Sequence, residues 1–172
     1  MPNKNTFSIK PIKEFISTAM EDNCNDQSVI IDPFANNSIF LDFCTFSNDL
    51  DTSMPTTHHM DAIEFLKSIE TNSVDFVLFD PPYSPRQVSE CYKSLDMTVN
   101  MQTTQSSFWG NLKKEISRVV KSGGVCITFG WNSGGVGKSS GFEIEEILIV
   151  AHGGWHNDTI CTMERKIKMD KA

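Results

Sequence analysis

The residues best suited to chemistry are a carboxylate and an aromatic ring on either side of two prolines, in the turn Asp80-Pro81-Pro82-Tyr83. The preceding run, residues 74–79, is almost continuously apolar, which is typical of a strand buried on both faces of a parallel sheet. Each proline lacks an N–H and fixes φ, so this strand is predicted to end abruptly in a stiff turn. Because ligands of open α/β sheets bind beyond the carboxyl ends of the strands, we expect Asp80 and Tyr83 at a ligand site.

This turn resembles the catalytic motif of the amino methyltransferases that use S-adenosyl-L-methionine (AdoMet), above all those acting on N6 of adenine in DNA. The resemblance implies that an oxygen of Asp80 and the carbonyl of Pro81 accept the two N–H hydrogens of the target amino group, on a corner stiffened by Pro82. Such bonds aim the nitrogen lone pair at the methyl group, without a covalent intermediate. Tyr83 is expected to stack on the target base, which must leave the duplex. The four residues alone also fit an ordinary proline turn, so the choice between this turn and a catalytic motif depends on the other motifs of the chain.

A second strand that ends in a turn precedes this one, and its Asp32-Pro33-Phe34 resembles the family's motif for binding AdoMet. In the family, small residues after this motif let the backbone approach the methionine part of the cofactor. The family usually has glycines there, whereas this chain has Asn36 and Asn37. Asparagine tolerates a positive φ better than most residues, so we expect the turn to form and to contact the cofactor, Asn36 included.

Two further acids have the spacing of cofactor ligands. Asp49 follows Asp32 by 17 positions, and an acid about 20 residues beyond the first turn holds ribose hydroxyls in Rossmann-like folds. Asp51 is the alternative. Asp61 begins a predicted helix as its cap, and the resemblance implies that the pair Asp61-Ala62 contacts the adenine of the cofactor.

The beginning of the chain carries a weaker signal. Pro11 lies near the first turn of a predicted helix with apolar residues on one face. A Lys-Pro pair followed by an amphipathic helix resembles the segment that covers the cofactor in this family, which implies that Phe7 and Lys10 lie there. A plain surface helix explains the pattern equally well.

Four side chains outside the motifs are candidates for holding the substrate. Arg86 lies in a polar segment after the catalytic turn, which is expected to form a flap or a partly helical loop over the substrate. Trp131 and Lys138 belong to a glycine-rich loop, where Lys138 is expected to face a phosphate. Trp155, between the last two predicted strands, fits either stacking on a base or packing on the domain.

Composition places the chain among ordinary soluble proteins. Its 172 residues, 39% hydrophobic and 22% charged, fit one domain over residues 1–172. No stretch has the apolar length of a membrane span, and five cysteines without a Cys-x-x-Cys pair fit reduced thiols in a cytoplasmic protein. No metal is expected, because His152, His156 and Cys161 lack a second cluster of ligands.

The net charge of −7 is at odds with unaided binding of DNA. A protein that grips DNA by itself usually carries a basic face. Three explanations stay open: basic residues cluster locally, a second copy or a partner subunit supplies the grip, or the substrate is not duplex DNA.

The order of the motifs, which the resemblance covers over residues 7–166, predicts an α/β, Rossmann-like class I AdoMet methyltransferase fold. We expect a mostly parallel sheet with a C-terminal antiparallel strand pair and helices on both faces. The predicted activity is N6 methylation of adenine in DNA, with low sequence specificity, because no insertion is large enough for a recognition region. Two alternatives stay open. One is the same chemistry on RNA adenine or on a protein glutamine amide. For the glutamine reaction, a catalytic motif of the form Asn-Pro-Pro-Tyr is commoner. The other alternative is a non-catalytic subunit with the AdoMet fold.

Overall fold

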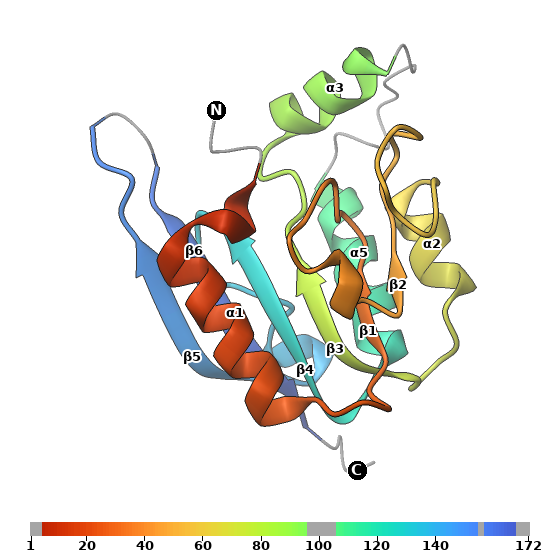
Figure 1. Cartoon of the computed structure of the whole chain (residues 1–172), viewed down its shortest axis with the longest axis vertical. Coiled ribbons are helices and arrows are strands. Elements are labelled where there is room, and N and C mark those ends of the chain that lie inside the picture. The colour runs from red at the N-terminus through yellow and green to blue at the C-terminus, as the bar shows by residue number, and fades with distance from the viewer. Residues whose placement is uncertain (1–4, 96–105, 155–156, 168–172) are drawn as a thin grey trace.

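The protein is built around a mixed six-stranded sheet (Figure 1). The computed structural model describes residues 5–95, 106–154 and 157–167. Its strands are β1 (Ile30–Asp32), β2 (Phe46–Ser47), β3 (Val74–Phe79), β4 (Val120–Gly130), β5 (Phe142–Val150) and β6 (Thr159–Lys166). They lie in the order β2-β1-β3-β4-β6-β5, where the first four are parallel and β6 runs antiparallel to β4 and to β5.

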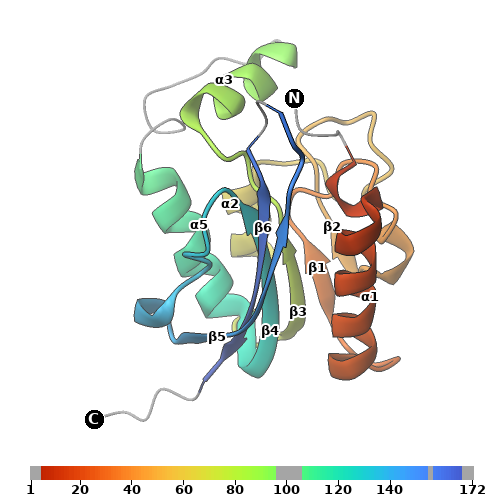
Figure 2. The same cartoon turned by 90° about the vertical axis from the view of Figure 1, so that its left-hand side faces the viewer.

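Helices cover both faces of this sheet (Figures 1 and 2). The α-helices are α1 (Lys10–Asn23), α2 (Ala62–Ser68), α3 (Pro85–Ser94) and α5 (Ser106–Val119), and the 3₁₀ turns are η1 (Thr6–Ser8), η2 (Leu41–Phe43) and η3 (Lys138–Ser140). Helix α1 packs on one face and helices α2 and α5 on the other, while α3 lies beyond the carboxyl ends of the parallel strands. The predicted fold class, with its C-terminal antiparallel pair, is confirmed.

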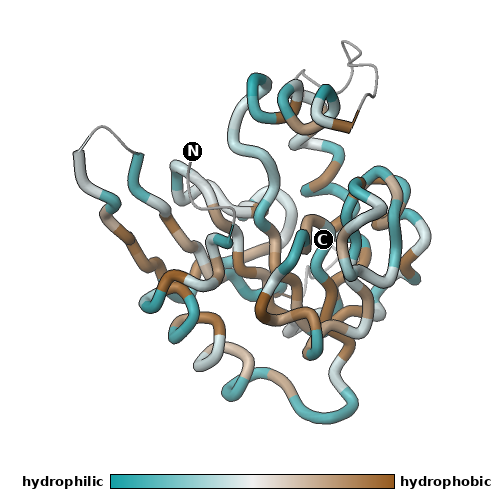
Figure 3. Tube along the Cα trace, turned by 45° about the horizontal axis from the view of Figure 1, so that its top comes forward, coloured by the Kyte–Doolittle hydropathy of each residue, from teal (hydrophilic) through white to brown (hydrophobic). Residues whose placement is uncertain are grey.

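Strand β3 is central because its side chains enter two cores in alternation. Phe76 and Leu78 pack with the residues of α1, whereas Val77 and Phe79 pack with those of α2 and α5. All four are at most 1% exposed, and the apolar tint of the strands in Figure 3 follows this burial. A strand held from both faces gives its carboxyl end a fixed position, as the continuous apolar run predicted.

Each helix near the site begins with a recognisable capping group. The Asp61 carboxylate accepts a hydrogen bond from the backbone N–H of Ile63 at 2.9 Å, which starts α2. Ser84 does the same for α3, because its hydroxyl accepts from the N–H of Gln87 at 3.3 Å, and Pro85 follows in the first turn. No helix of the described residues is long and apolar enough to cross a membrane.

Some predicted boundaries differ from the structure. Residues 43–49 have the composition of a strand, but only the two residues of β2 form one, and the short stretch at His58 forms a single bridge to Asn48. The Lys-Ser-Gly-Gly run at residues 121–124 has the composition of a turn between a helix and a strand. Instead α5 ends at Val119 and β4 begins at Val120, which pairs with Val74, and the run forms an irregularity of the ladder before pairing resumes between Phe76 and Val125.

The loop after β4 is pinned by a buried acid. Glu164 of β6 has no exposed surface, and its carboxylate accepts hydrogen bonds from the N–H groups of Val136 and Gly137 at 2.6 and 2.9 Å. Gly135 makes this approach possible, since its φ is +49° and a Cβ there would lie 2.2 Å from the Glu164 carboxylate. The loop therefore turns down along α5, where Ser117 donates to the carbonyl of Ser140 at 2.8 Å.

This geometry predicts that Gly135→Ala lowers the free energy of unfolding by about 2 kcal/mol, through a strained backbone and a displaced carboxylate. Gly110→Ala is the matched control, because a Cβ at this helical position meets nothing within 4 Å. It is expected to stabilise the fold by about 0.5–1 kcal/mol. Urea unfolding of the two variants measures both values, and an equal effect at both positions would contradict the role given to Glu164.

Candidate functional site

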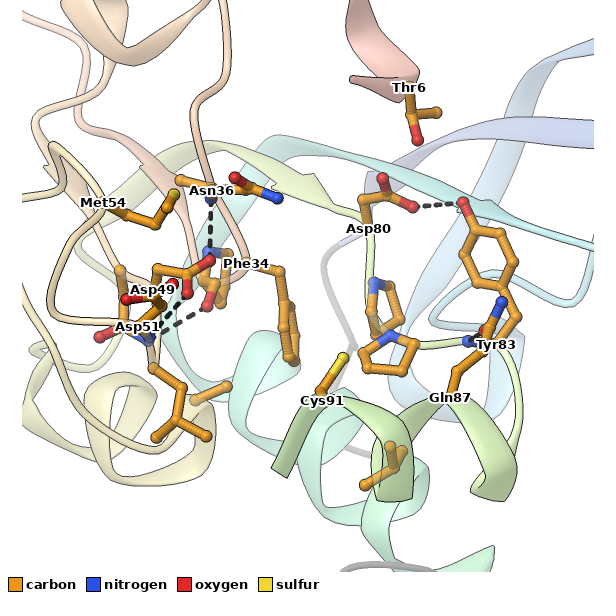
Figure 4. A pocket seen from close by; sticks show the side chains of 18 of the residues that line it. Thr6, Phe34, Asn36, Asp49, Asp51, Met54, Asp80, Tyr83, Gln87 and Cys91 are labelled. Atoms are coloured by element: carbon orange, nitrogen blue, oxygen red, sulfur yellow. Dashed lines mark hydrogen bonds between the residues drawn. The ribbon is translucent and has the colours of Figure 1, made fainter. Parts of the chain in front are cut away.

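A pocket of about 880 Å³ lies at the carboxyl ends of β1 and β3 (Figure 4). Its volume is in the range of cofactor and small-ligand sites. Its walls come from η1, from the turns after β1 and β3, from the segment after β2, from the start of α2 and from α3. The predicted site residues that line it are Phe7, Pro33, Phe34, Asn36, Asp49, Asp61, Ala62, Asp80, Pro81, Pro82, Tyr83, Arg86 and Trp131.

The turn after β3 is fastened from two sides. Trp109 of α5 donates its indole N–H to the carbonyl of Pro82 at 2.9 Å, and the N–H of Tyr83 donates to the side chain of Gln87 at 2.6 Å. The carbonyl of Pro81 receives no hydrogen bond from the described residues. The turn therefore presents one free backbone acceptor beside the Asp80 carboxylate, on a frame that cannot easily relax.

Asp80 is the principal ionisable group of this turn. Burial raises its pKa to about 6, while hydrogen bonds from Tyr83 and Thr6 lower it in part. Figure 4 shows Thr6 and Tyr83 on two sides of the carboxylate. At neutral pH the carboxylate is therefore mostly ionised and can accept further hydrogen bonds from a ligand.

Two aromatic side chains stand beside this carboxylate. Tyr83 donates its hydroxyl to an oxygen of Asp80, and its ring meets Trp131 nearly edge-on, with centroids 5.5 Å apart and an interplanar angle of 69°. Trp131 is 39% exposed at the mouth of the pocket. The two rings form an aromatic wall on which a planar ligand can pack.

The turn after β1 contains a buried acid with an unsatisfied oxygen. Asp32 has no exposed surface, and one of its oxygens accepts from the N–H of Phe34 at 3.0 Å. The other oxygen has no partner among the described residues. Burial raises the pKa of Asp32 well above its ordinary value. An acid in this state fits a ligand that brings a donor or a positive charge.

Asn36 and Asp49 are joined across the same end of the pocket. Asn36 has a φ of +47°, so asparagine forms the left-handed turn in place of the family's glycines. Its N–H donates to one oxygen of Asp49 at 3.0 Å, and the N–H of Asp51 donates to the other at 2.8 Å. Burial is the main cause that raises the pKa of Asp49. The Asp49 carboxylate is thus held in place with acceptor capacity left for hydroxyl groups.

Asp61 combines the helix cap with a second contact. One oxygen accepts from Ile63, as described above, and the other accepts the hydroxyl of Tyr92 of α3 at 2.7 Å. Ala62 is buried beside it. Asp49 after β2 and Asp61 at the start of α2 thus line one pocket, while Asp32 is buried at the end of β1. The acceptors on Asp49 and Asp61 fit the ribose and amino groups of AdoMet, and the orphaned oxygen of Asp32 fits a donor such as its ammonium.

Four predicted residues are not among the described residues that line the pocket. Asp32 is one of them, because it is fully buried at the end of β1. Lys10 is the first residue of α1, and its side chain is 85% exposed near Glu14, because the opposite face of the helix packs on the sheet. Lys138 does not line the pocket, because the contacts of Glu164 turn its loop toward the far end of α5. The prediction that Lys138 faces a substrate phosphate therefore finds no support in the described structure. Trp155 lies outside the described residues.

Several residues of the site were not predicted from the sequence. Thr6, Gln87 and Tyr92 line the pocket, and Trp109 supports the turn from behind. Gln87 and Tyr92 lie in the segment that was expected to form a flap, and only its polar character pointed to the site. The described residues hold no group of three or more His, Cys, Asp or Glu that could bind a metal.

Comparison with solved structures defines the fold as that of the class I AdoMet-dependent methyltransferases. A methyltransferase named yhhF from Escherichia coli has a TM-score of 0.61 at 9% identity, over 94% of this chain and 88% of the other. A Burkholderia thailandensis 1,6-didemethyltoxoflavin-N1-methyltransferase with bound S-adenosylhomocysteine has a TM-score of 0.57 at 10% identity, over 90% and 76% of the two chains. SMU.1697c from Streptococcus mutans, in complex with SAH (S-adenosylhomocysteine), has a TM-score of 0.56 at 12% identity, over 90% of this chain and 97% of the other. No protein-family model matches the chain, and a search of the curated proteins finds no significant match.

The buried acids predict how stability depends on pH. Because burial raises the pKa of Asp32 in the folded state above that of the unfolded chain, folding takes up a proton between the two values. The free energy of unfolding is therefore expected to fall as the pH rises from about 4. Asp32→Asn should flatten this fall, and Asp26→Asn, at an exposed position outside the pocket, should leave it unchanged. Urea unfolding between pH 4 and pH 7 measures the slope, and identical slopes in both variants would refute the assignment.

Proposed function

We propose that the chain is an AdoMet-dependent methyltransferase that acts on N6 of adenine in DNA. The observation that carries the proposal is the pairing of the Asp80 carboxylate with the free carbonyl of Pro81, on one stiff turn facing the cofactor acids. An exocyclic amino group has two hydrogens, and this turn offers two acceptors of fixed direction. The fold of the structural neighbours supports the methyl-transfer part of the proposal.

The turn would act by orientation and by electrostatic stabilisation. Asp80 and Pro81 accept the two hydrogens of the amino group, which draws its nitrogen out of conjugation and directs the lone pair. The hydrogen bonds from Trp109 and to Gln87 keep the backbone of the turn in place while the amino group binds. Tyr83 and Trp131 supply the aromatic wall for the base, which has left its duplex.

On the cofactor side, each acid has a separate part of AdoMet to hold. When bound, AdoMet supplies a methyl group on a positively charged sulfonium. Asp32 and the Asn36 turn would hold the methionine part, Asp49 the ribose hydroxyls, and Asp61 with Ala62 the adenine. Acidic walls favour the net positive cofactor, and the same residues are poor ligands for a polyanion.

We therefore expect that part of the basic surface that binds nucleic acid belongs to a second copy of the chain or to a partner subunit. Among the described residues that line the pocket, Arg86 is the one cation, and it pairs with Glu90 at 2.8 Å with its side chain 87% exposed. Some of the other basic residues, namely Arg118, Lys121 and Lys166, hydrogen-bond to groups of the fold. Arg118, for example, donates to the carbonyls of Leu66 and Ile69.

Purified protein with labelled AdoMet, offered DNA, RNA and protein extract in parallel, tests the proposal. Label is expected on adenine N6 of DNA. Asp80→Ala is expected to lower the transfer rate by about 10²–10³-fold or more, while calorimetry finds cofactor affinity nearly intact, because the residue acts on the acceptor. Label on RNA alone or on glutamine would contradict DNA as the substrate and would identify RNA or protein in its place. Absence of AdoMet binding would indicate a non-catalytic subunit.

The pH dependence of kcat/KM tests the role of Asp80. Since the carboxylate must be ionised to accept hydrogen bonds, kcat/KM is expected to fall as the pH drops through about 6. The Tyr83 hydroxyl lowers the pKa of Asp80, so Tyr83→Phe should move this fall to higher pH. Trp131→Phe, which alters the neighbouring ring without touching the carboxylate, should leave its midpoint in place. An unshifted midpoint in Tyr83→Phe would contradict the assignment.

A further inference from the structure

The two tyrosines of the chain stand in the same relation to two acids of the site. Tyr83 donates its hydroxyl to Asp80, and Tyr92 donates its hydroxyl to Asp61 at 2.7 Å. Both acids are those to which the proposed function gives an amino group, the target's in one case and the cofactor adenine's in the other. Each acid therefore bonds to a hydroxyl of the protein itself.

Helix α3 joins these two contacts. It follows the catalytic turn directly, since Ser84 is its cap and Gln87 accepts from the N–H of Tyr83. Val88 anchors its middle in the core with no exposed surface, and Tyr92 lies one turn further along, partly buried against the same core. The pocket that contains Asp49 and Asp61 is also lined by residues of α3, among them Gln87, Cys91 and Tyr92.

The acceptor positions of Asp61 are already assigned. One oxygen is committed to the helix cap through Ile63, which leaves the oxygen bonded to Tyr92 as the acceptor for a ligand. A carboxylate oxygen that accepts one strong hydrogen bond is a weaker acceptor for a second. An amino group that binds this oxygen of Asp61 either shares a weakened acceptor with Tyr92 or replaces the bond to Tyr92, and replacement leaves it the stronger acceptor.

We propose that Tyr92 is a specificity-determining residue of the cofactor subsite, whose hydroxyl holds the Asp61 oxygen until an adenine amino group exchanges with it. The inference rests on the proposed function, because it takes Asp61 as the adenine contact. A ligand with an amino group replaces one donor by another and leaves the acid satisfied. A ligand with a carbonyl at that position brings no donor, so Tyr92 stays in place.

The test compares S-adenosylhomocysteine with its inosine analogue, in which a carbonyl replaces the amino group of adenine. Calorimetry gives the dissociation constants of both for the wild type and for Tyr92→Phe. In the variant no bond has to be exchanged, so S-adenosylhomocysteine is expected to bind about three- to tenfold more tightly. The inosine analogue has no amino group to exchange with the hydroxyl and should bind no better, so the ratio of the two constants rises by at least this factor.

Two further variants keep the result interpretable. Ser89→Ala removes another hydroxyl of α3, at a position that does not line the pocket, and should leave the ratio unchanged. Asp61→Asn offers an amide N–H in place of an acceptor, so it should lower the ratio below that of the wild type. A reversal at Asp61→Asn supports the contact even if Tyr92→Phe folds poorly.

Equal shifts of both constants in Tyr92→Phe, in either direction, would overturn the inference, because a residue that merely walls the pocket affects both ligands alike. An unchanged ratio in Asp61→Asn would overturn it as well. If the wild type binds neither ligand, the proposed function fails and this inference fails with it. Binding with equal shifts leaves the proposed function standing and removes only the role of Tyr92.

Discussion

The site depends on how β3 ends. A strand packed from both faces cannot shift, and two prolines and two side-chain hydrogen bonds prevent the following turn from relaxing. The Asp80 carboxylate and the Pro81 carbonyl are therefore set in direction before any ligand arrives. A preformed pair of acceptors reduces the reorganisation needed in the reaction, which is where such sites gain most of their effect.

Burial of the acids is the second constraint. Asp32, Asp49 and Asp80 all have a pKa raised mainly by desolvation, so the acids in and beside the pocket lack full solvation. Hydroxyl groups of Tyr83 and Tyr92 satisfy part of this need, whereas one oxygen of Asp32 stays without a partner. A cationic ligand with several donors would satisfy what the fold leaves open, which connects the stability of the fold to its proposed cofactor.

Local patterns predicted the centre of the site but not its supports. The apolar run before Asp80 and the prolines after it are local signals, and both were sufficient to place the turn. Trp109 lies 27 positions from Pro82, and Tyr92 lies 31 positions from Asp61, so these contacts exist only once the fold has formed. The placement of Lys138 was missed for the same reason, because a buried contact from Glu164 directs its loop.

The central claim is that the turn after β3 faces a methyl donor. A crystal structure with S-adenosylhomocysteine bound tests it most directly. The account predicts that the sulfur lies in the pocket opposite Asp80 and Pro81, with a gap between them that admits a flat base beside Tyr83. A ligand bound elsewhere, or a sulfur separated from Asp80 by side chains of the protein itself, would contradict the account.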